Sequence, residues 1–216
     1  GQFGDATSSF QKLVNMTANA PGGYQLLARA YWSNKRYDDA RRVYRQALTL
    51  KNVNLGPVVL DLMNFEAQRG NFDQALSYAT QLRKEFPRTS VADATIGDIY
   101  MGARQWEKAA QAYESARKVS FTKPVAFNLG EAYFRQGKLE PAVAVVRDFN
   151  RRKPTDIAPR MVIADFYMRA KRYDLAKVEY ETLVKSAPSN AAMLNNLAWV
   201  YQSSKDPRAL ATGEKA

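Results

Sequence analysis

The 216-residue chain contains no cysteine and no histidine. Their absence excludes disulfide bonds, thiolate nucleophiles, zinc sites of the usual Cys/His kind and histidine-based acid–base catalysis. Paired carboxylates remain as a route to catalysis or to a Mg²⁺ or Ca²⁺ site. Because nothing in the chain can oxidise to a disulfide, the composition fits an oxidising and a reducing compartment equally well.

The sequence also lacks a run of about 18 apolar residues, which a membrane-spanning helix would need. Its first residues, GQFGDATSS, do not follow the pattern of a secretion signal. We therefore predict a soluble segment with no transmembrane segment in this chain. Charge is unevenly balanced, with 32 Lys and Arg against 21 Asp and Glu and a net charge of +11. Such an excess favours an anionic partner such as a nucleic acid, an acidic polysaccharide or a membrane surface.

What the sequence does contain is a repeat of about 34 residues. The string KRYDDARRVYRQAL begins at Lys35 and KRYDLAKVEYETL begins at Lys171, an interval of four times 34. Six alanines mark the repeat at spacings of 34, 35, 34, 33 and 34: Ala6, Ala40, Ala75, Ala109, Ala142 and Ala176. Apolar residues placed three before, four after and seven after each alanine share one face of a helix. A second apolar helix precedes each of these, so each unit is a helix, a turn and a helix.

Glycine and proline mark the limits of these helices. In the turns QRGN (68–71) and RQGK (135–138), the glycines are expected to adopt positive φ at a helix end. Two prolines are expected in the first turns of helices and three at the ends of repeats. These are Pro57 and Pro124, and then Pro87, Pro154 and Pro188.

This pattern resembles the tetratricopeptide repeat family, in which Leu-Gly, Tyr, Ala, an aromatic residue, Ala and Pro recur across 34 positions. The strings IGDIYMGARQWEKAAQAYESARK and LGEAYFRQGKLEPAVAVVRDF follow it closely, while Glu66 and Met63 depart from it. The resemblance implies an all-α, right-handed solenoid of helix-turn-helix repeats with about 12 helices. It also implies a non-catalytic protein–protein interaction scaffold with no cofactor and no metal.

The alignment of repeats predicts a single array over 1–216. Its parts are the second helix of a truncated repeat (1–20), five full repeats (21–55, 56–89, 90–122, 123–156 and 157–190) and a partial sixth repeat (191–216). Phe3, Phe10 and Leu13 lack a preceding helix to cover them, so we expect the chain to be a fragment of a longer array. A last helix is expected to start at Pro207 and to run for about three turns.

The final string, LNNLAWVYQSSKDPRALATGEKA, is similar to the last repeats of tetratricopeptide lipoproteins associated with PEP-CTERM and exosortase systems. This similarity implies a role in bacterial exopolysaccharide secretion or envelope assembly. It places the protein in the periplasm or at the outer membrane, and a cytoplasmic location stays open.

First helices of such repeats line a concave groove, which is the expected partner-binding site. The residues predicted to form it are Arg29, Trp32, Asn64, Gln68, Asp98, Met101, Phe127, Asn128, Glu131, Phe134, Arg135, Met161, Asp165, Met168, Arg169, Asn195 and Trp199. Charges on this face nearly cancel, which argues against nucleic acid in the groove. Its large apolar side chains favour a protein or peptide partner instead. Phe134 and Met168 are expected to supply apolar contacts to that partner. Neither Phe134 nor Asp98 is expected to take part in the packing of the repeats.

Asp98, Glu131 and Asp165 occupy equivalent positions in three successive repeats and are predicted to form an acidic ladder. One interpretation is local ion pairs, because Arg135 and Arg169 follow four residues after the second and third acid, whereas a glycine follows the first. Others are recognition of a basic, amphipathic partner and carboxylate catalysis.

The excess positive charge lies on the second helices and the loops. Its residues are Arg41, Arg42, Arg45, Arg83, Lys84, Arg117, Lys118, Arg147, Arg151, Arg152 and Lys153. Two interpretations stay open. These side chains are either a solvated face that keeps the array soluble or a binding surface for an anionic polymer, such as a polysaccharide or nucleic acid.

Overall fold

The computed structural model describes residues 2–17, 19–85 and 89–216. Pro87 lies outside these residues, as does the side chain of Phe3, so the expectations for them are not addressed. Within the described residues the regular elements are thirteen α-helices. The predicted all-α class is confirmed, with one short helix more than the twelve expected.

The chain divides into two compact units, which are treated separately here. Unit 1 (1–105) contains α1 (Gln2–Met16), α2 (Pro21–Ser33), α3 (Tyr37–Ala47), α4 (Gly56–Gln68), α5 (Phe72–Glu85) and α6 (Val91–Gly102). Unit 2 (106–216) contains α7 (Trp106–Val119), α8 (Lys123–Arg135), α9 (Leu139–Arg152), α10 (Ala158–Arg169), α11 (Tyr173–Ser186), α12 (Ala191–Ser203) and α13 (Ala209–Gly213). The division falls inside the repeat expected at 90–122, and the single array over 1–216 stays a prediction.

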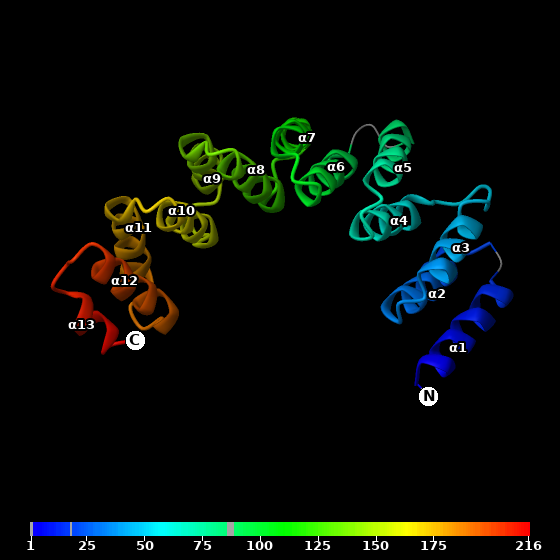
Figure 1. The fold of residues 1–216 in the computed structure, drawn as a ribbon, viewed down its shortest axis with the longest axis horizontal. Coiled ribbons are helices and arrows are strands. Elements are labelled where there is room, and N and C mark those ends of the chain that lie inside the picture. Colours follow the sequence, from blue (N-terminus) through cyan, green and yellow to red (C-terminus); the bar gives the residue numbers. More distant parts are fainter. Residues whose placement is uncertain (1, 18, 86–88) are drawn as a thin grey trace. The chain divides into compact units, whose positions relative to one another are not determined.

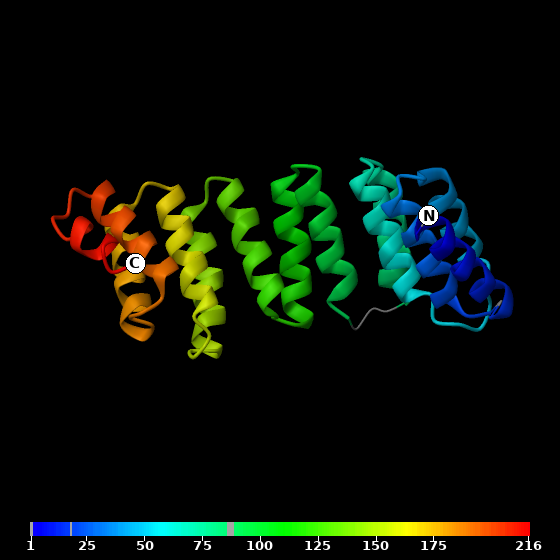
Figure 2. The ribbon, with the colours of Figure 1, turned by 90° about the horizontal axis from the view of Figure 1, so that it is seen from below.

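Within each unit, consecutive helices pack in pairs (Figure 1). The first helices of neighbouring repeats also touch, α2 with α4 and α4 with α6 in unit 1, and α8 with α10 in unit 2. Figure 2 shows α8, α9 and α10 side by side. These contacts between first helices create the surfaces on which the predicted binding residues lie.

A left-handed residue closes the turn between the two helices of a repeat. Its φ is positive at Lys35 (61°), Gly70 (79°), Arg104 (58°), Gly137 (76°), Lys171 (57°) and Lys205 (57°). In the fourth of these turns, the amide of Lys138 donates to the carbonyl of Tyr133 at 3.0 Å, which satisfies a carbonyl at the end of α8. The prediction for the two glycines is confirmed. The same conformation at four basic residues was not predicted.

Prolines lie where the sequence indicates. Pro57 and Pro124 occupy the first turns of α4 and α8, where a missing amide hydrogen costs no helical hydrogen bond. Pro154 and Pro188 follow the ends of α9 and α11. The prediction of a three-turn helix from Pro207 is wrong, because α13 has five residues and begins at Ala209.

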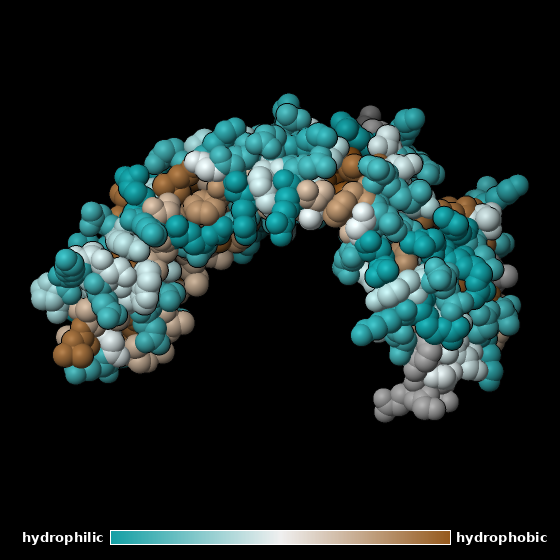
Figure 3. Space-filling view, viewed as in Figure 1, coloured by the Kyte–Doolittle hydropathy of each residue, from teal (hydrophilic) through white to brown (hydrophobic). Residues whose placement is uncertain are grey.

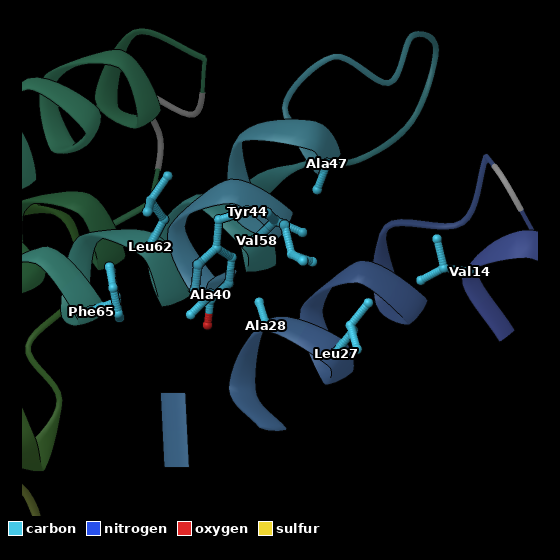
Figure 4. Close-up of a cluster of buried hydrophobic side chains, with 10 residues drawn as sticks. Val14, Leu27, Ala28, Ala40, Tyr44, Ala47, Val58, Leu62 and Phe65 are labelled. Atoms are coloured by element: carbon cyan, nitrogen blue, oxygen red, sulfur yellow. The ribbon is translucent and has the colours of Figure 1, made fainter. Parts of the chain in front are cut away.

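The core of unit 1 lies between the helices of successive repeats (Figure 4). Its buried side chains include Val14, Leu27, Ala28, Ala40, Tyr44, Ala47, Val58, Leu62 and Phe65, from α1 to α4. At α1, Phe10 is partly buried against this cluster, whereas Leu13 remains 37% exposed. Burial of apolar surface stabilises the fold by about 25 cal/mol per Å². Because it determines which face of each helix is buried, it also determines which face is left exposed.

Gly130 marks a close approach in unit 2. A Cβ atom at this position would lie 2.9 Å from Val146 Cγ2 and 3.1 Å from Phe166 Cε2. A side chain would therefore push α8 away from α9 and α10. This confirms that the small residue of the repeat permits neighbouring helices to pack closely.

Candidate protein-binding surface

Every predicted binding residue lies on a first helix, and the set is divided between the two units. In unit 1 these are Arg29 and Trp32 on α2, Asn64 and Gln68 on α4, and Asp98 and Met101 on α6. In unit 2 they are Phe127, Asn128, Glu131, Phe134 and Arg135 on α8, Met161, Asp165, Met168 and Arg169 on α10, and Asn195 and Trp199 on α12.

In unit 2, the two acids of the predicted ladder belong to a network of ion pairs. Glu131 accepts hydrogen bonds from both terminal nitrogens of Arg169, at 2.7 and 2.9 Å, and from Nε of Arg135 at 2.6 Å. Asp165 accepts from Arg169 at 3.2 Å. Burial alone would raise the pKa of Glu131, but the hydrogen bonds and charges of the two arginines outweigh it and lower that pKa. Local ion pairing is therefore confirmed here, and it extends between repeats.

The same arginine covers a pair of stacked aromatic rings. The rings of Phe134 and Phe166 lie 5.2 Å apart, centroid to centroid, at an interplanar angle of 10°. The guanidinium of Arg169 lies 4.1 Å from the centroid of Phe134. Phe134 thus links α8 to α10, and the expectation that it has no packing role is wrong.

Two of the predicted binding residues of unit 2, on α10 and α12, are large apolar side chains that remain exposed. Met161 is 37% exposed and Trp199 is 48% exposed. The ring of Trp199 meets that of Tyr173 edge to face, at 5.8 Å between centroids and an angle of 72°. Beside it is a cleft of about 600 Å³ lined by Asn195, Ala198, Trp199, Gln202, Ala209, Leu210, Gly213 and Glu214, here called the α12 cleft.

Two predicted residues of unit 1 are engaged within the fold. Arg29 binds the carboxylate of Asp61, which also accepts from Gln25 at 2.9 Å. Trp32 packs edge to face on the buried ring of Phe65, with centroids 5.5 Å apart. These contacts orient α2 against α4.

Three other predicted residues of unit 1 share a second cleft, here called the α4–α6 cleft. Its volume is about 430 Å³, and it is lined by Asn64, Ala67, Gln68, Gly70, Phe72, Asp98, Ile99 and Gly102. The lining therefore combines the polar side chains of Asn64, Gln68 and Asp98 with apolar residues. Met101 is not among the lining residues.

Several of the basic residues on the second helices hold neighbouring repeats together, a role that neither interpretation of them included. Arg41 binds Glu66 through two hydrogen bonds of 2.7 and 2.8 Å. Arg147 donates to Glu179 at 3.1 Å. Sequence reasoning missed both carboxylates as buried partners, although Glu66 occupies a tyrosine position of the repeat and was therefore conspicuous.

Around Arg41 a third cleft of about 1040 Å³ has balanced charges. Its lining residues include Arg41, Arg42 and Arg45, together with Asp38, Glu66 and Asp73. Arg42 is itself paired with Asp39. This cleft therefore offers an anionic polymer little net attraction.

In Figure 3, polar side chains cover most of the visible face of each unit, with smaller apolar areas between them. Among the described residues, no helix has the length and hydropathy to cross a membrane, and no cluster of three or more acidic side chains could hold a metal ion.

The repeats match those of a known family. Two models described as tetratricopeptide repeat match residues 94–157 and 162–216, and residues 21–54. The chain belongs to the tetratricopeptide repeat family. No curated protein sequence matches it. The family generally mediates protein–protein interactions, which makes the first-helix surfaces candidates for binding a protein.

Solved structures share the fold at low sequence identity. The C-terminal part of a TPR repeat-containing protein from Cytophaga hutchinsonii is 20% identical with a TM-score of 0.74, over 99% of this chain and 89% of that chain. PilF of Pseudomonas aeruginosa is 16% identical with a TM-score of 0.63, over 90% of this chain and 89% of that chain. In the APC/C Cut9–Hcn1 complex, the similar chain is 18% identical with a TM-score of 0.63, and this chain spans 42% of its length. These similarities extend to the fold alone.

Proposed function

We propose that the protein is a non-catalytic scaffold that binds a segment of a partner protein on the first helices of unit 2. The observation that carries this proposal is the exposure of Met161 and Trp199 on α10 and α12. Tryptophan and methionine are enriched in the cores of protein interfaces, and Met adapts its shape to the bound surface. The α12 cleft beside Trp199 would receive an apolar side chain.

The charges of this surface indicate the chemistry of the bound segment. Glu131 and Asp165 are already paired with Arg135 and Arg169. The sequence of α12, AAMLNNLAWVYQS, contains no charged residue. An apolar or amide-rich segment therefore suits unit 2 better than a strongly basic one, and its binding should depend weakly on salt.

The basic second helices do not extend this proposal to an anionic polymer. Arg41, Arg117 and Arg147 bind the carboxylates of Glu66, Asp148 and Glu179 across repeats. Their charge is therefore partly compensated, and a polysaccharide would compete with ion pairs that hold the fold together.

The cellular setting that we propose is bacterial exopolysaccharide secretion or envelope assembly, in the periplasm or at the outer membrane. It rests on the similarity of the string beginning at Leu194 to the last repeats of exosortase-associated lipoproteins. In the native host, the protein should fractionate with the envelope, and its deletion should reduce exported polysaccharide. Recovery in the cytoplasm with unchanged export would contradict this setting.

Site-specific photo-crosslinking tests the binding surface itself. A benzoylphenylalanine placed at Met161 should crosslink a partner protein in the native host, since this position lies on the proposed surface. The matched control is Val178 on α11, which is 56% exposed and apolar but lies on a second helix. Equal crosslinking from both positions, or none from Met161, would contradict the proposal.

A further inference from the structure

The space between neighbouring first helices is filled between α8 and α10 in unit 2 and open between α4 and α6 in unit 1. Between α8 and α10 it is occupied by the side chains of Phe134, Phe166 and Arg169. Counting back from the repeat alanines, the equivalent positions between α4 and α6 are Ala67, Ile99 and Gly102. The α4–α6 cleft of about 430 Å³ lies where those larger side chains are missing.

The chemistry of this cleft resembles that around Arg169. In unit 2, the guanidinium of Arg169 binds Glu131 and Asp165 and lies over the ring of Phe134. In unit 1, Asn64 and Asp98 occupy the positions equivalent to these two acids, and both line the cleft. A guanidinium entering from outside would meet a carboxylate and an amide oxygen among the lining groups.

The apolar lining and the charge of the cleft suit an arginine side chain as a whole. Phe72 provides apolar surface for the three methylene groups of an arginine, and Gly102 leaves room for them. Among the residues that line the α4–α6 cleft, Asp98 is the one charged residue. Its carboxylate can accept from a further donor beside the contact that it makes within the fold. The cleft is therefore complementary to a cation with a long apolar stem.

We propose that the α4–α6 cleft binds an arginine side chain supplied by a partner protein, in the position that Arg169 occupies in unit 2. Arginine fits better than lysine because its planar guanidinium can bond to Asp98 and Asn64 at once. This inference rests on the proposed function, since it assigns the arginine to a bound protein. It adds a basic anchor at unit 1 to the apolar contacts at unit 2.

Nuclear magnetic resonance of the full chain tests the proposal with a defined probe, N-acetyl-arginine N-methylamide. This molecule has no free amino or carboxyl group and so represents a side chain within a polypeptide. It should shift the side-chain amide signals of Asn64 and Gln68 in a saturable manner. The citrulline analogue has nearly the same shape without the charge and should bind about tenfold more weakly or worse. Equal binding of the two probes would overturn the proposal.

Substitution of Gly102 gives the sharpest variant. A Cβ at Gly102 would lie 3.6 Å from a ring carbon of Phe72, which is an ordinary contact, so α6 can carry a side chain there. Gly102→Arg should fill the cleft with an internal guanidinium and abolish the shifts caused by the probe. Ser77→Arg adds the same charge at an exposed position of α5 and should leave them unchanged.

A second variant separates charge from shape. Asp98→Asn keeps the size of the side chain and should weaken the arginine probe about tenfold while leaving the weak citrulline binding unchanged. Full binding in Gly102→Arg or in Asp98→Asn would overturn the arginine site. Crosslinking from Met161 does not depend on this cleft. Loss of that crosslinking would count against the proposed function. Crosslinking that persists while the arginine probe fails to bind would count against this inference alone.

Discussion

Removal of Arg41 should destabilise unit 1 strongly, because it would leave a buried carboxylate without its counter-ion. Only 2% of the Glu66 side chain is exposed, and Arg41 reaches it from the preceding repeat with 26% of its own side chain exposed. Breaking a fully buried ion pair costs about 3 to 5 kcal/mol. Partial exposure of Arg41 and the remaining 2.6 Å hydrogen bond from Asn71 reduce the expected loss for Arg41→Met to about 2 to 3 kcal/mol.

The loss should depend on pH in a defined direction. Burial raises the pKa of Glu66, but hydrogen bonds from Arg41 and Asn71 outweigh it, and the pKa falls below 4.5. The wild-type carboxylate therefore contributes stability that is present above pH 4.5 and is lost as the pH falls through its lowered pKa. Without Arg41, burial should raise the pKa of Glu66 instead. The variant should then be weakest at neutral pH and approach the wild type as the pH falls toward 4.5.

Urea unfolding of the wild type and three variants at neutral pH and near pH 4.5 would measure these effects. Arg42→Met is the matched control, because Arg42 is 59% exposed and pairs with Asp39 on the surface, a contact worth about 0 to 1 kcal/mol. Adding Glu66→Gln to Arg41→Met should restore much of the stability, since it removes the buried charge. Equal midpoints for the two arginine variants, or a difference that does not change with pH, would refute the reasoning.

Three further substitutions test packing and backbone conformation in unit 2. Lys171→Gly should raise the free energy of unfolding by about 0.5 to 1 kcal/mol in urea titrations, because Lys171 has a φ of 57°. Gly130→Ala should lower it by about 1 to 2 kcal/mol through the close contact with Val146, and an unchanged midpoint would contradict the close approach of α8. Phe134→Ala should lower the melting temperature because its ring stacks on Phe166, and an unchanged temperature would show that Phe134 is not a packing residue.

Much of the fold could be predicted because it depends on local periodicity. Ala40, Ala75, Ala109 and Ala142 are fully buried, since the alanine at this position faces the partner helix in each repeat. The same local logic places glycine at the turn, as at Gly137. It did not predict positive φ at the basic residues, because a stable turn can impose a conformation that the residue itself disfavours.

Interactions between repeats were harder to predict from the sequence. Arg41 lies 25 residues from Glu66, which it binds, and the arginines that bind Glu179 lie 32 and 19 residues from it. Glu66 replaces the tyrosine of the repeat, and Glu179 directly precedes Tyr180. The typical side chains at these repeat positions are not charged, so no consensus pattern pairs either carboxylate with an arginine. Each pairing depends on which arginine side chain is long enough, and so directed, to reach the carboxylate on a neighbouring helix. The spacing of residues along the sequence does not contain that geometry.

The first-helix surface illustrates the same difficulty at the candidate site. Spacing along one helix correctly pairs Glu131 with Arg135, but it does not show that Arg169 reaches back from α10 to the same carboxylate on α8. Gly102 stands at the position equivalent to Arg169. Because glycine has no side chain, it leaves open the space that an arginine fills in the later repeats. The polarity of each groove segment therefore depends on residues from two successive repeats. Unit 1 and unit 2 can accordingly present different chemistry from one repeat pattern.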